Sequence, residues 1–496
     1  MWTRFFNLYS RFTLCLWGGL AASIFIFNTL QFDLYIHLLS TVTVRFVVPI
    51  LFASMFFFML RLNANTRLAI ANTLTAIMIA LYAGEFYLAV QMESVRHDAA
   101  AAPGAEFDAR NKLTVIKDLR GKGVNAFPVM RAANMLADQN GVLQPVLSSQ
   151  GSGLLPMASI PDTTVVSCNE TGKWQIYVSD RHGFNNPDSE WNVPHPKIGI
   201  VGDSFAHGSC VPSEQNIAAG LRTKFGNAIN LGVGGFGPLL ELAALTEYLE
   251  PLKPAKVLWV FYEGNDLTDD LPYESRSPLL ETYLKDDKFS QHLMARRSEI
   301  ADSMRSFMKK DLVSAMERVD GPLEGLVRFA SLDRMRERIG LGAVQIGFNL
   351  GELDAELKLF HEIIVKARDR VAAWNGQLYL VYLPESARYL SVFGTGTLRQ
   401  EIYHGVNDIV AREGIPLIDI SKVFADTGAP ESLYVYPGSH FNAEGYRVAA
   451  DAIASVLEAA PGGSAGGKQA RHPVQPTNGG GPEAITPPPA HTMKGS

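Results

Sequence analysis

Hydrophobic residues crowd the first ninety positions of the chain in three runs separated by short polar stretches. The runs cover residues 14–30, 46–60 and 68–90. The first and third runs are long enough to cross the hydrocarbon core of a bilayer, and the second is shorter. Three such runs so close together favour membrane spans over buried helices of a soluble domain. The pattern predicts a membrane anchor of about three transmembrane helices over residues 1–92.

Basic residues between these runs indicate how the anchor is oriented. Arg4 and Arg11 precede the first run, and Arg61 and Arg67 lie between the second and third, whereas the loop after the first run offers only Arg45. Because basic loops stay on the cytoplasmic side, the amino terminus is predicted to be cytoplasmic and the domain after three spans to lie outside. If the second run only dips into the membrane, that domain faces the cytoplasm instead. No small-residue cleavage pattern follows the first run, so the anchor is predicted to be retained.

The hydrophobic pattern changes after a linker and an amino-terminal extension over residues 93–190. Over residues 191–460, short β-branched runs alternate with amphipathic helical segments, which predicts an α/β fold: a three-layer sandwich with a mostly parallel sheet. Charged, helix-forming segments interrupt the alternation at about 271–351; they are predicted to form a helical cap, the simpler alternative being solvated helices. Residues 461–496 are rich in Gly and Pro and are predicted to be disordered.

Composition narrows the possible functions. A formal net charge of −6 gives no indication of a nucleic-acid partner. The chain has three cysteines, which form no zinc-binding pattern, and it contains neither a His-Glu-x-x-His motif nor a P-loop. A Gly-x-Gly-x-x-Gly pattern begins at Gly232, but it does not follow the first strand of the alternation and lacks a convincing acid downstream, so a nucleotide site is disfavoured. No metal or organic cofactor is expected.

Four residues at the predicted sheet edge suggest acyl chemistry. Ser204 follows a buried strand within Gly-Asp-Ser-Phe, and Gly235 and Asn265 follow the next two strands. A serine hydroxyl, a backbone N–H and an amide NH₂ at adjacent strand ends would form a nucleophile with an oxyanion hole. His440, just before the last helix, would be the general base. Taken singly, the Gly-Asp-Ser segment could be a simple turn and His440 a polar residue at a helix start.

The order of four short blocks is more specific than any one of them. The blocks G-D-S-F, N-L-G-V-G-G, G-N-D and S-H-F-N-A-E-G-Y resemble the SGNH (GDSL-type) hydrolases, and the resemblance spans about residues 198–457. It implies that Ser204, Gly235, Asn265 and His440 form the catalytic set. The segment Y-V-S-D-R-H-G-F-N-N-P resembles a stretch that precedes the first block in membrane-anchored bacterial members. This resemblance favours a structural role for its Asp180 and His182.

The sequence departs from the family at the acid that orients the histidine. The family usually has an aspartate two or three residues before the histidine, where this chain has Gly438 and Pro437. Either a Ser–His dyad operates or an acid comes from elsewhere in the chain. Asp419, Asp269 and Asp270 are conceivable, and no acid is assigned from the sequence.

The cysteines leave a second question open. If the domain lies outside the cytoplasm, Cys168 and Cys210 could form a disulfide that ties a predicted hairpin to the loop just after Ser204. Two separate buried thiols are the alternative. Cys15 lies within the first apolar run and is predicted to stay free.

These observations predict a membrane-tethered extracytoplasmic serine esterase in a bacterial inner membrane, with its catalytic domain facing the periplasm or cell exterior. Its substrates would be acyl esters, with acetyl the favoured group, on cell-envelope or exported polysaccharide. One alternative is an O-acyltransferase that passes the acyl group to a sugar hydroxyl. A second is a non-catalytic carbohydrate-binding or envelope-assembly protein. The sequence indicates no particular protein partner or oligomeric state.

Overall fold

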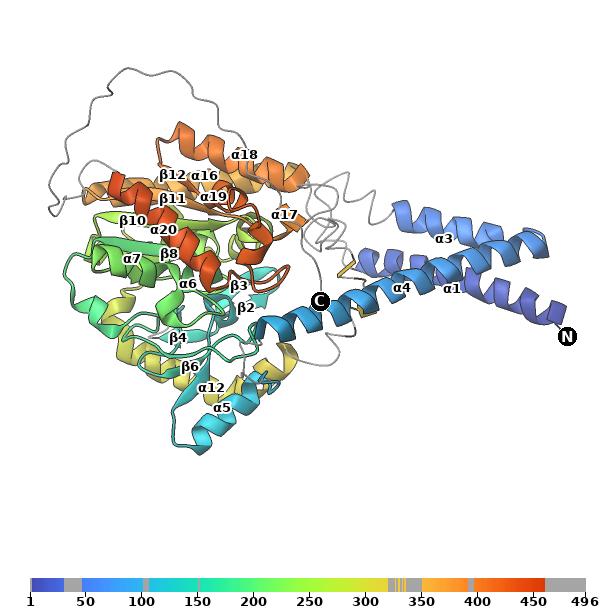
Figure 1. The fold of residues 1–496 in the computed structure, drawn as a ribbon, viewed down its shortest axis with the longest axis horizontal. Coiled ribbons are helices and arrows are strands. Elements are labelled where there is room, and N and C mark those ends of the chain that lie inside the picture. The colour runs from blue at the N-terminus through green and yellow to red at the C-terminus, as the bar shows by residue number, and fades with distance from the viewer. Residues whose placement is uncertain are drawn as a thin grey trace, which may run out of the picture.

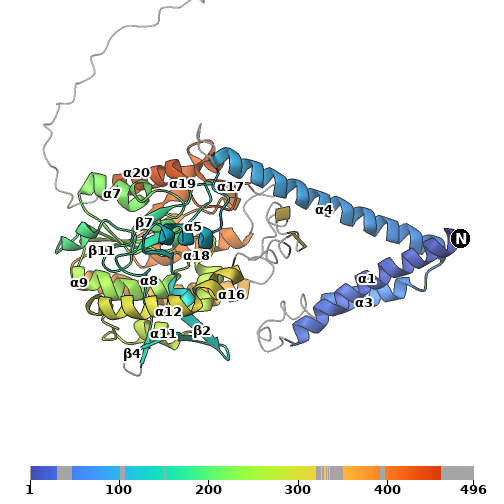
Figure 2. The same ribbon diagram turned by 90° about the horizontal axis from the view of Figure 1, so that it is seen from below.

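The amino-terminal helices project from the rest of the protein in this computed structural model (Figure 1). The structure describes residues 2–30, 47–100, 107–149, 152–319, 326, 329–330, 332, 334–335, 350–390 and 397–459. Helix α1 (Trp2–Leu30) packs against α3 (Val48–Met59) and α4 (Ala64–Ala100), as Figure 2 shows. Helix α4 then leads to the globular part of the chain.

One helix among the described residues has the length and hydropathy needed to cross a membrane. It covers Ala64–Gln91 within α4, and a shorter apolar helix covers Pro49–Met59 within α3. The first predicted run lies within α1. The structure thus bears out an apolar helix near the amino terminus, whereas the number of spans stays a prediction.

The centre of the globular part is a five-stranded sheet in which all neighbouring strands are parallel. The spatial order is β12-β11-β10-β8-β9. Apolar side chains point to both faces of the sheet, which is why its longer strands are almost continuous hydrophobic runs. The strands are β8 (Ile198–Gly202), β9 (Ile229–Asn230), β10 (Lys256–Tyr262), β11 (Gln377–Leu383) and β12 (Leu417–Asp419).

Helices cover both faces of this sheet (Figure 1). Successive residues of a strand point to opposite faces, so Leu258 of β10 belongs to one core cluster and Trp259 to the other. The Leu258 cluster includes residues of α7 (Ile217–Phe225), α19 (Ile420–Ala425) and α20 (Ala443–Ala459). The Trp259 cluster includes residues of α8 (Pro238–Ala244), α16 (Leu350–Ala373) and α18 (Thr397–Arg412).

The predicted insertion forms helices in its described part, namely α10 (Leu271–Glu274), α11 (Pro278–Lys285) and α12 (Arg297–Val319). Leu280 and Tyr283 of α11 are fully buried in the same core cluster as Trp259, and α11 contacts α8. This part of the segment therefore extends the helical layer on the α8 face of the sheet.

The amino-terminal extension builds a small sheet of its own. Its elements are α5 (Lys112–Gly121), β1 (Ala126–Pro128), β2 (Leu136–Gln139), β3 (Val142–Pro145), β4 (Leu147–Ser149), β5 (Ser152–Leu154), β6 (Thr164–Val166) and β7 (Ile176–Val178). Strand β6 pairs in parallel with β1 and antiparallel with β7, and the β6–β7 pair matches the hairpin predicted around Cys168. Two short hairpins, β2–β3 and β4–β5, precede β6.

A buried aspartate fixes the loop that leads from this extension to the main sheet. The Asp180 carboxylate accepts hydrogen bonds from the backbone N–H of His182 at 2.8 Å, from Asn186 Nδ2 at 2.8 Å and from Trp191 Nε1 at 2.7 Å. Burial raises the pKa of Asp180 to about 6, and these donors oppose that rise. Asp180 therefore has the contacts of a loop-fixing residue.

Gly202, at the end of β8, allows the chain to turn toward Ser204. Its φ is +156°, and a methyl group there would lie 2.6 Å from Ala206 Cβ and 2.8 Å from Val260 Cβ. A methyl group at this position would both overpack the site and strain the backbone. Gly202→Ala is therefore expected to lower the free energy of unfolding by about 2–4 kcal/mol. Chemical denaturation in detergent measures this change. Gly121→Ala is the matched control, since a methyl group at Gly121 meets no atom within 4 Å, and equal midpoints for the two variants would contradict the prediction.

Candidate active site

Ser204 stands at the carboxyl end of β8, where the chain enters the short helix α6 (Ser204–His207). The side chain of Asp203 caps this helix by accepting a hydrogen bond from the Phe205 N–H at 2.8 Å. Gly208 ends the helix in a left-handed conformation, with φ of +77°. Asp203 and Gly208 thus fix the two ends of α6 and hold Ser204 at the edge of the sheet, beside a cleft.

His440 approaches Ser204 from the loop before α20. His440 Nε2 lies 2.9 Å from Ser204 Oγ, although the two residues are 236 positions apart in sequence. The backbone of the histidine is held because its carbonyl accepts a hydrogen bond from the Val435 N–H at 3.0 Å. The ring packs against Phe205, with 4.9 Å between ring centroids. The structure brings together the serine and histidine that the sequence singled out.

Glu170 is the acid that contacts the histidine, and it lies in the amino-terminal extension. Its Oε1 lies 2.8 Å from His440 Nδ1, and its Oε2 accepts a hydrogen bond from the His440 N–H at 3.0 Å. A carboxylate at Nδ1 keeps the proton on that nitrogen and leaves Nε2 to accept a proton from Ser204. The three side chains therefore form a continuous Ser–His–Glu chain.

Sequence reasoning missed Glu170, because it precedes the serine block and lies outside the span of the family resemblance. Two of the acids it considered, Asp419 and Asp269, have other contacts. Asp419 caps α19 through the Ser421 N–H at 3.0 Å and accepts a hydrogen bond from the Tyr403 hydroxyl. The signal that could have found Glu170 was its place two residues after Cys168.

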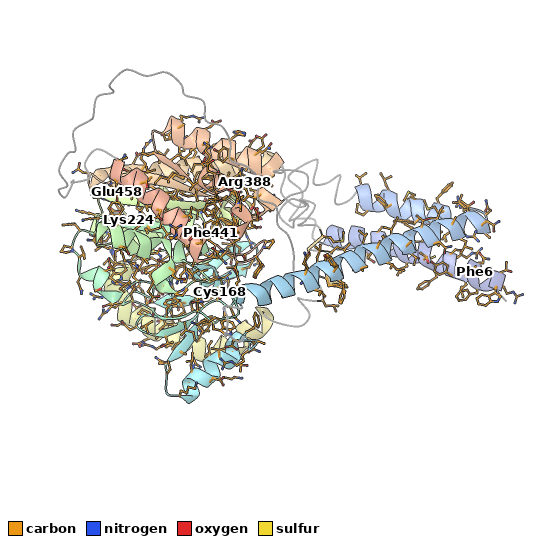
Figure 3. All side chains as sticks on the ribbon, in the orientation of Figure 1. Phe6, Cys168, Lys224, Arg388, Phe441 and Glu458 are labelled. Atoms are coloured by element: carbon orange, nitrogen blue, oxygen red, sulfur yellow. A yellow bond between two sulfur atoms is a disulfide. The ribbon has the colours of Figure 1, made fainter. Side chains whose placement is uncertain are left out.

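Cys168 and Cys210 form a disulfide, which answers the question that the sequence left open. Cys168 is labelled on the globular part of the chain in Figure 3. The bond ties the segment that carries Glu170 to the loop just after α6, so it brings the acid to the serine side of the sheet. Cys168, Glu170 and Cys210 offer ligand atoms within 4.8 Å of one another. Because both sulfurs are in the disulfide, the set lacks the thiolates that a metal centre would require. Cys15 is a free cysteine, as predicted.

Gly235 and Asn265 line the same cleft as Ser204. Gly235 has φ of +77°, and within the described ranges its N–H donates no hydrogen bond. The backbone carbonyl of Asn265 accepts hydrogen bonds from the N–H groups of Asp269 at 2.9 Å and Asp270 at 3.0 Å, which fixes Asn265 at the end of β10. Gly235, with its open backbone N–H, and Asn265 thus both lie at the cleft that contains Ser204.

The cleft has a volume of about 700 Å³, a size that suits a small-molecule ligand. One wall is the carboxyl edge of the sheet, and the other is the amino-terminal extension. In the described part of the predicted cap, no residue lines the cleft, and the cap role stays a prediction. The lining residues are Phe107, Asp108, Ala109, Arg110, Asn111, Lys112, Val129, Arg131, Ser167, Cys168, Asn169, Glu170, Trp174, Ser204, His207, Ser209, Gly234, Gly235, Asn265, Asp270 and His440.

Charges around the histidine favour its protonated form. Burial lowers the pKa of His440, but the negative charge and hydrogen bond of Glu170, assisted by the charge of Asp203, raise that pKa above its ordinary value. The positive charge of Arg131 acts in the opposite direction. An imidazolium that forms during proton transfer from Ser204 would therefore be stabilised mainly by Glu170.

Asp270, which lines the cleft, interacts electrostatically with two further buried carboxyl groups, Glu241 and Asp266. Burial raises the pKa of Asp270 to about 8, with further contributions from Asp203 and Asp269. Burial also raises the pKa of Glu241 and Asp266 well above their usual range. Burial therefore favours the neutral form of each group and reduces the negative charge near the candidate oxyanion hole.

Comparisons with known proteins give fold-level likeness only. The chain is similar to solved GDSL-type hydrolases. One is named as a lipolytic protein of the G-D-S-L family from Desulfitobacterium hafniense: it is 14% identical, the match covers 53% of this chain and 100% of that chain, and the TM-score is 0.31. Another is a lipase/acylhydrolase from Enterococcus faecalis, 13% identical over 53% of this chain and 95% of that chain, with a TM-score of 0.30.

An acetyl xylan esterase is also similar, at 12% identity over 52% of this chain and 99% of that chain, with a TM-score of 0.28. Of these three, the protein from Desulfitobacterium hafniense bears the family name that the sequence motifs predicted. No protein-family model and no curated protein matches the chain.

Proposed function

We propose that the protein is a serine esterase that cleaves acyl esters through a covalent acyl-enzyme. The observation that carries the proposal is the hydrogen-bonded chain from Ser204 Oγ through His440 to Glu170, at 2.9 Å and 2.8 Å. A serine, a correctly oriented imidazole and a carboxylate in this order form the arrangement that activates a serine hydroxyl.

In the proposed mechanism, Ser204 Oγ attacks the ester carbonyl carbon while His440 Nε2 takes the hydroxyl proton. The carbonyl oxygen becomes an oxyanion that the N–H groups of Ser204 and Gly235 and the side-chain amide of Asn265 stabilise. The tetrahedral intermediate collapses when His440 returns the proton to the leaving alcohol. Water, deprotonated by His440, then attacks the acyl-Ser204 carbonyl carbon; the bond from that carbon to Ser204 Oγ breaks, His440 returns the proton to Oγ, and the carboxylic acid leaves. Glu170 remains ionised and orients the imidazole throughout.

We place this activity outside the cytoplasm, tethered to a bacterial inner membrane. Three lines of argument support the placement: the candidate span Ala64–Gln91 in α4, the distribution of basic residues between the apolar runs, and the Cys168–Cys210 disulfide, since disulfides persist in oxidising compartments. Proposed substrates are acyl esters, chiefly acetyl esters, on cell-envelope or exported polysaccharide. The cleft is large enough to hold a whole sugar ester, and not only its acetyl group.

Labelling with a fluorophosphonate probe tests the proposal, because the probe reacts with an activated serine. We expect the full chain in detergent to be labelled and to hydrolyse short-chain aryl esters. Ser204→Ala and His440→Ala should abolish labelling, and Ser204→Ala should reduce turnover by at least about 10³-fold.

Ser209→Ala is the matched control for this experiment. Ser209 lines the same cleft, but its Oγ lies 3.4 Å from His207 Nδ1 rather than next to His440. Labelling that persists in Ser204→Ala would assign the reactive serine elsewhere. A wild-type protein that is neither labelled nor active on aryl esters would favour the non-catalytic alternative.

A further inference from the structure

Arg131 is a charged residue of the cleft that the proposed mechanism does not use. It follows β1 in the amino-terminal extension, and its backbone neighbours are held in place. The Val129 N–H donates to the Val166 carbonyl at 3.0 Å, and the Met130 N–H donates to Ser159 Oγ at 3.1 Å. These hydrogen bonds fix the backbone of the loop that presents Arg131 to the cleft. A fixed backbone reduces the conformational entropy that is lost when a ligand binds.

The side chain of Arg131 lies across the loop that carries the candidate oxyanion hole. A methyl group on Gly234 would lie 3.6 Å from Arg131 Nε and 3.6 Å from Ser204 Cβ. A methyl group on Gly235 would lie 3.5 Å from Arg131 Cδ. The guanidinium and the nucleophile thus flank the same small region, and a substrate bound at Ser204 lies within reach of the arginine.

The charge of Arg131 has no counter-ion in the part of the chain that the structure describes. None of those residues forms a hydrogen bond or an ion pair with its guanidinium, and Arg131 is exposed to the cleft. Asp270 lines the same cleft; burial raises the pKa of its carboxyl group to about 8 against the opposing effect of the Arg131 charge, which makes it a weak counter-ion near pH 7. Arg110 of the same cleft differs, since it is paired with Asp108 and Asp118, each at 2.6 Å.

This positive charge opposes the catalysis proposed above. It lowers the pKa of His440 and so disfavours the imidazolium that forms when Ser204 loses its proton. A substrate that brings an anionic group would neutralise the charge and recover a charge-assisted hydrogen bond. Guanidinium groups suit carboxylate and phosphate oxygens because they can bind them in a bidentate manner.

We infer that Arg131 binds an anionic group, a carboxylate or a phosphate, that the substrate carries near its scissile ester. This inference rests on the proposed function and narrows its substrate class to esters of acidic compounds, such as an acetylated acidic sugar. Arg131 would then select substrates by charge, while the serine, histidine and glutamate perform the reaction.

Three acetate esters with matched rings test the inference: 4-acetoxybenzoate, its neutral methyl ester and 4-acetoxyphenyl phosphate. Arg131→Gln should lower kcat/KM by about 10- to 100-fold for an anionic ester, mainly through KM, the loss expected for a hydrogen bond to a charged group. Hydrolysis of the neutral ester should change by less than about 3-fold. Arg131→Lys should retain part of the preference, and the anionic ester with the larger loss in Arg131→Gln identifies the preferred group.

Arg110→Gln is the matched control, because its charge is already neutralised, and it should leave the anionic-to-neutral ratio unchanged. An Arg131→Gln variant that leaves all three rates unchanged would overturn the inference. Equal losses for all three esters would also overturn it, since Arg131 would then act on the reaction centre whatever the substrate charge.

A binding measurement separates this inference from the proposed function. Ligand-observed NMR with the Ser204→Ala protein should detect binding of 4-hydroxybenzoate or 4-hydroxyphenyl phosphate, but not of neutral 4-hydroxybenzamide. Introducing Arg131→Gln into the Ser204→Ala protein should abolish binding of both anionic ligands. If the wild type hydrolyses no ester yet this binding pattern is found, the proposed function fails and the anion site stands. If neither anion binds in preference to the amide, the anion site fails.

Discussion

Replacing Glu170 by Gln is expected to lower kcat for a short-chain aryl ester by about 10³- to 10⁴-fold, with little change in KM. The amide can still contact His440 Nδ1, but it provides neither the negative charge nor a reliable preference for the correct tautomer. Loss of the orienting carboxylate in a triad of this kind costs about 10⁴-fold in turnover. Steady-state kinetics with purified protein in detergent measure the effect.

The pH profile of the Glu170→Gln variant should carry a distinct signature. His440 must be neutral to accept the serine proton, so activity rises as pH increases through the pKa of His440. Glu170 raises that pKa in the wild type, whereas burial lowers it. Without the carboxylate, the pKa of His440 falls and the acid limb of the kcat profile moves to lower pH. A merely structural role for Glu170 would lower the rate without this shift.

Asp269→Asn is the control for this prediction, because sequence reasoning placed Asp269 among the conceivable acids. Its carboxylate contacts the Thr268 hydroxyl at 3.4 Å rather than His440. We expect less than about a 3-fold change in kcat and an unchanged acid limb. A large loss in Asp269→Asn, together with a mild effect of Glu170→Gln, would place the acid of the triad elsewhere.

Removing the Cys168–Cys210 disulfide is expected to cost both stability and activity. The bond joins residues 42 positions apart, and closing a loop of this length stabilises a fold by about 4 kcal/mol in the chain-entropy model. The paired Cys168→Ser and Cys210→Ser substitutions should lower the melting temperature. They should also lower kcat at temperatures where the variant is still folded, because the segment that carries Glu170 loses its covalent tie to the loop after Ser204.

A double-mutant comparison separates these two effects of the disulfide. If the bond supports activity through Glu170, removing it from the Glu170→Gln protein should lower kcat far less than removing it from the wild type. Cys15→Ser is the control, since Cys15 is a free cysteine in α1, and it should change neither property. Equal losses of kcat in the two backgrounds would show that the disulfide acts independently of Glu170.

Several features of the chain can be inferred from local sequence. The apolar runs that form β8 and β10 are bounded by turn-forming residues and bury both faces, so their hydrophobic pattern indicates strands. Ser204, Gly235 and Asn265 each lie shortly after the end of a strand, namely β8, β9 and β10. Because parallel strands end at one edge of a sheet, the pattern of strands is enough to predict that these three residues lie close together. His440 required the family resemblance, since a histidine before a helix has no distinctive pattern.

Glu170 and Arg131 could not be placed in this way. Both belong to the amino-terminal extension, which packs against the sheet edge through contacts that no local periodicity encodes. The fold of that extension, and the disulfide at Cys168, bring the two residues into a cleft with Ser204. The sequence also predicted that the insertion forms a cap. In the part of the chain that the structure describes, the amino-terminal extension, and not the insertion, lines the cleft.

The sequence by itself determined the alternating α/β pattern, the apolar amino-terminal region and the serine, histidine, glycine and asparagine of the candidate site. These features depend on residue periodicity and on short motifs at strand ends, which are local properties of the chain. The tertiary structure alone decided that Glu170 completes the Ser–His chain and that Arg131 faces the same cleft. Contacts between segments distant in sequence depend on the packing of whole elements, and local sequence patterns do not encode that packing.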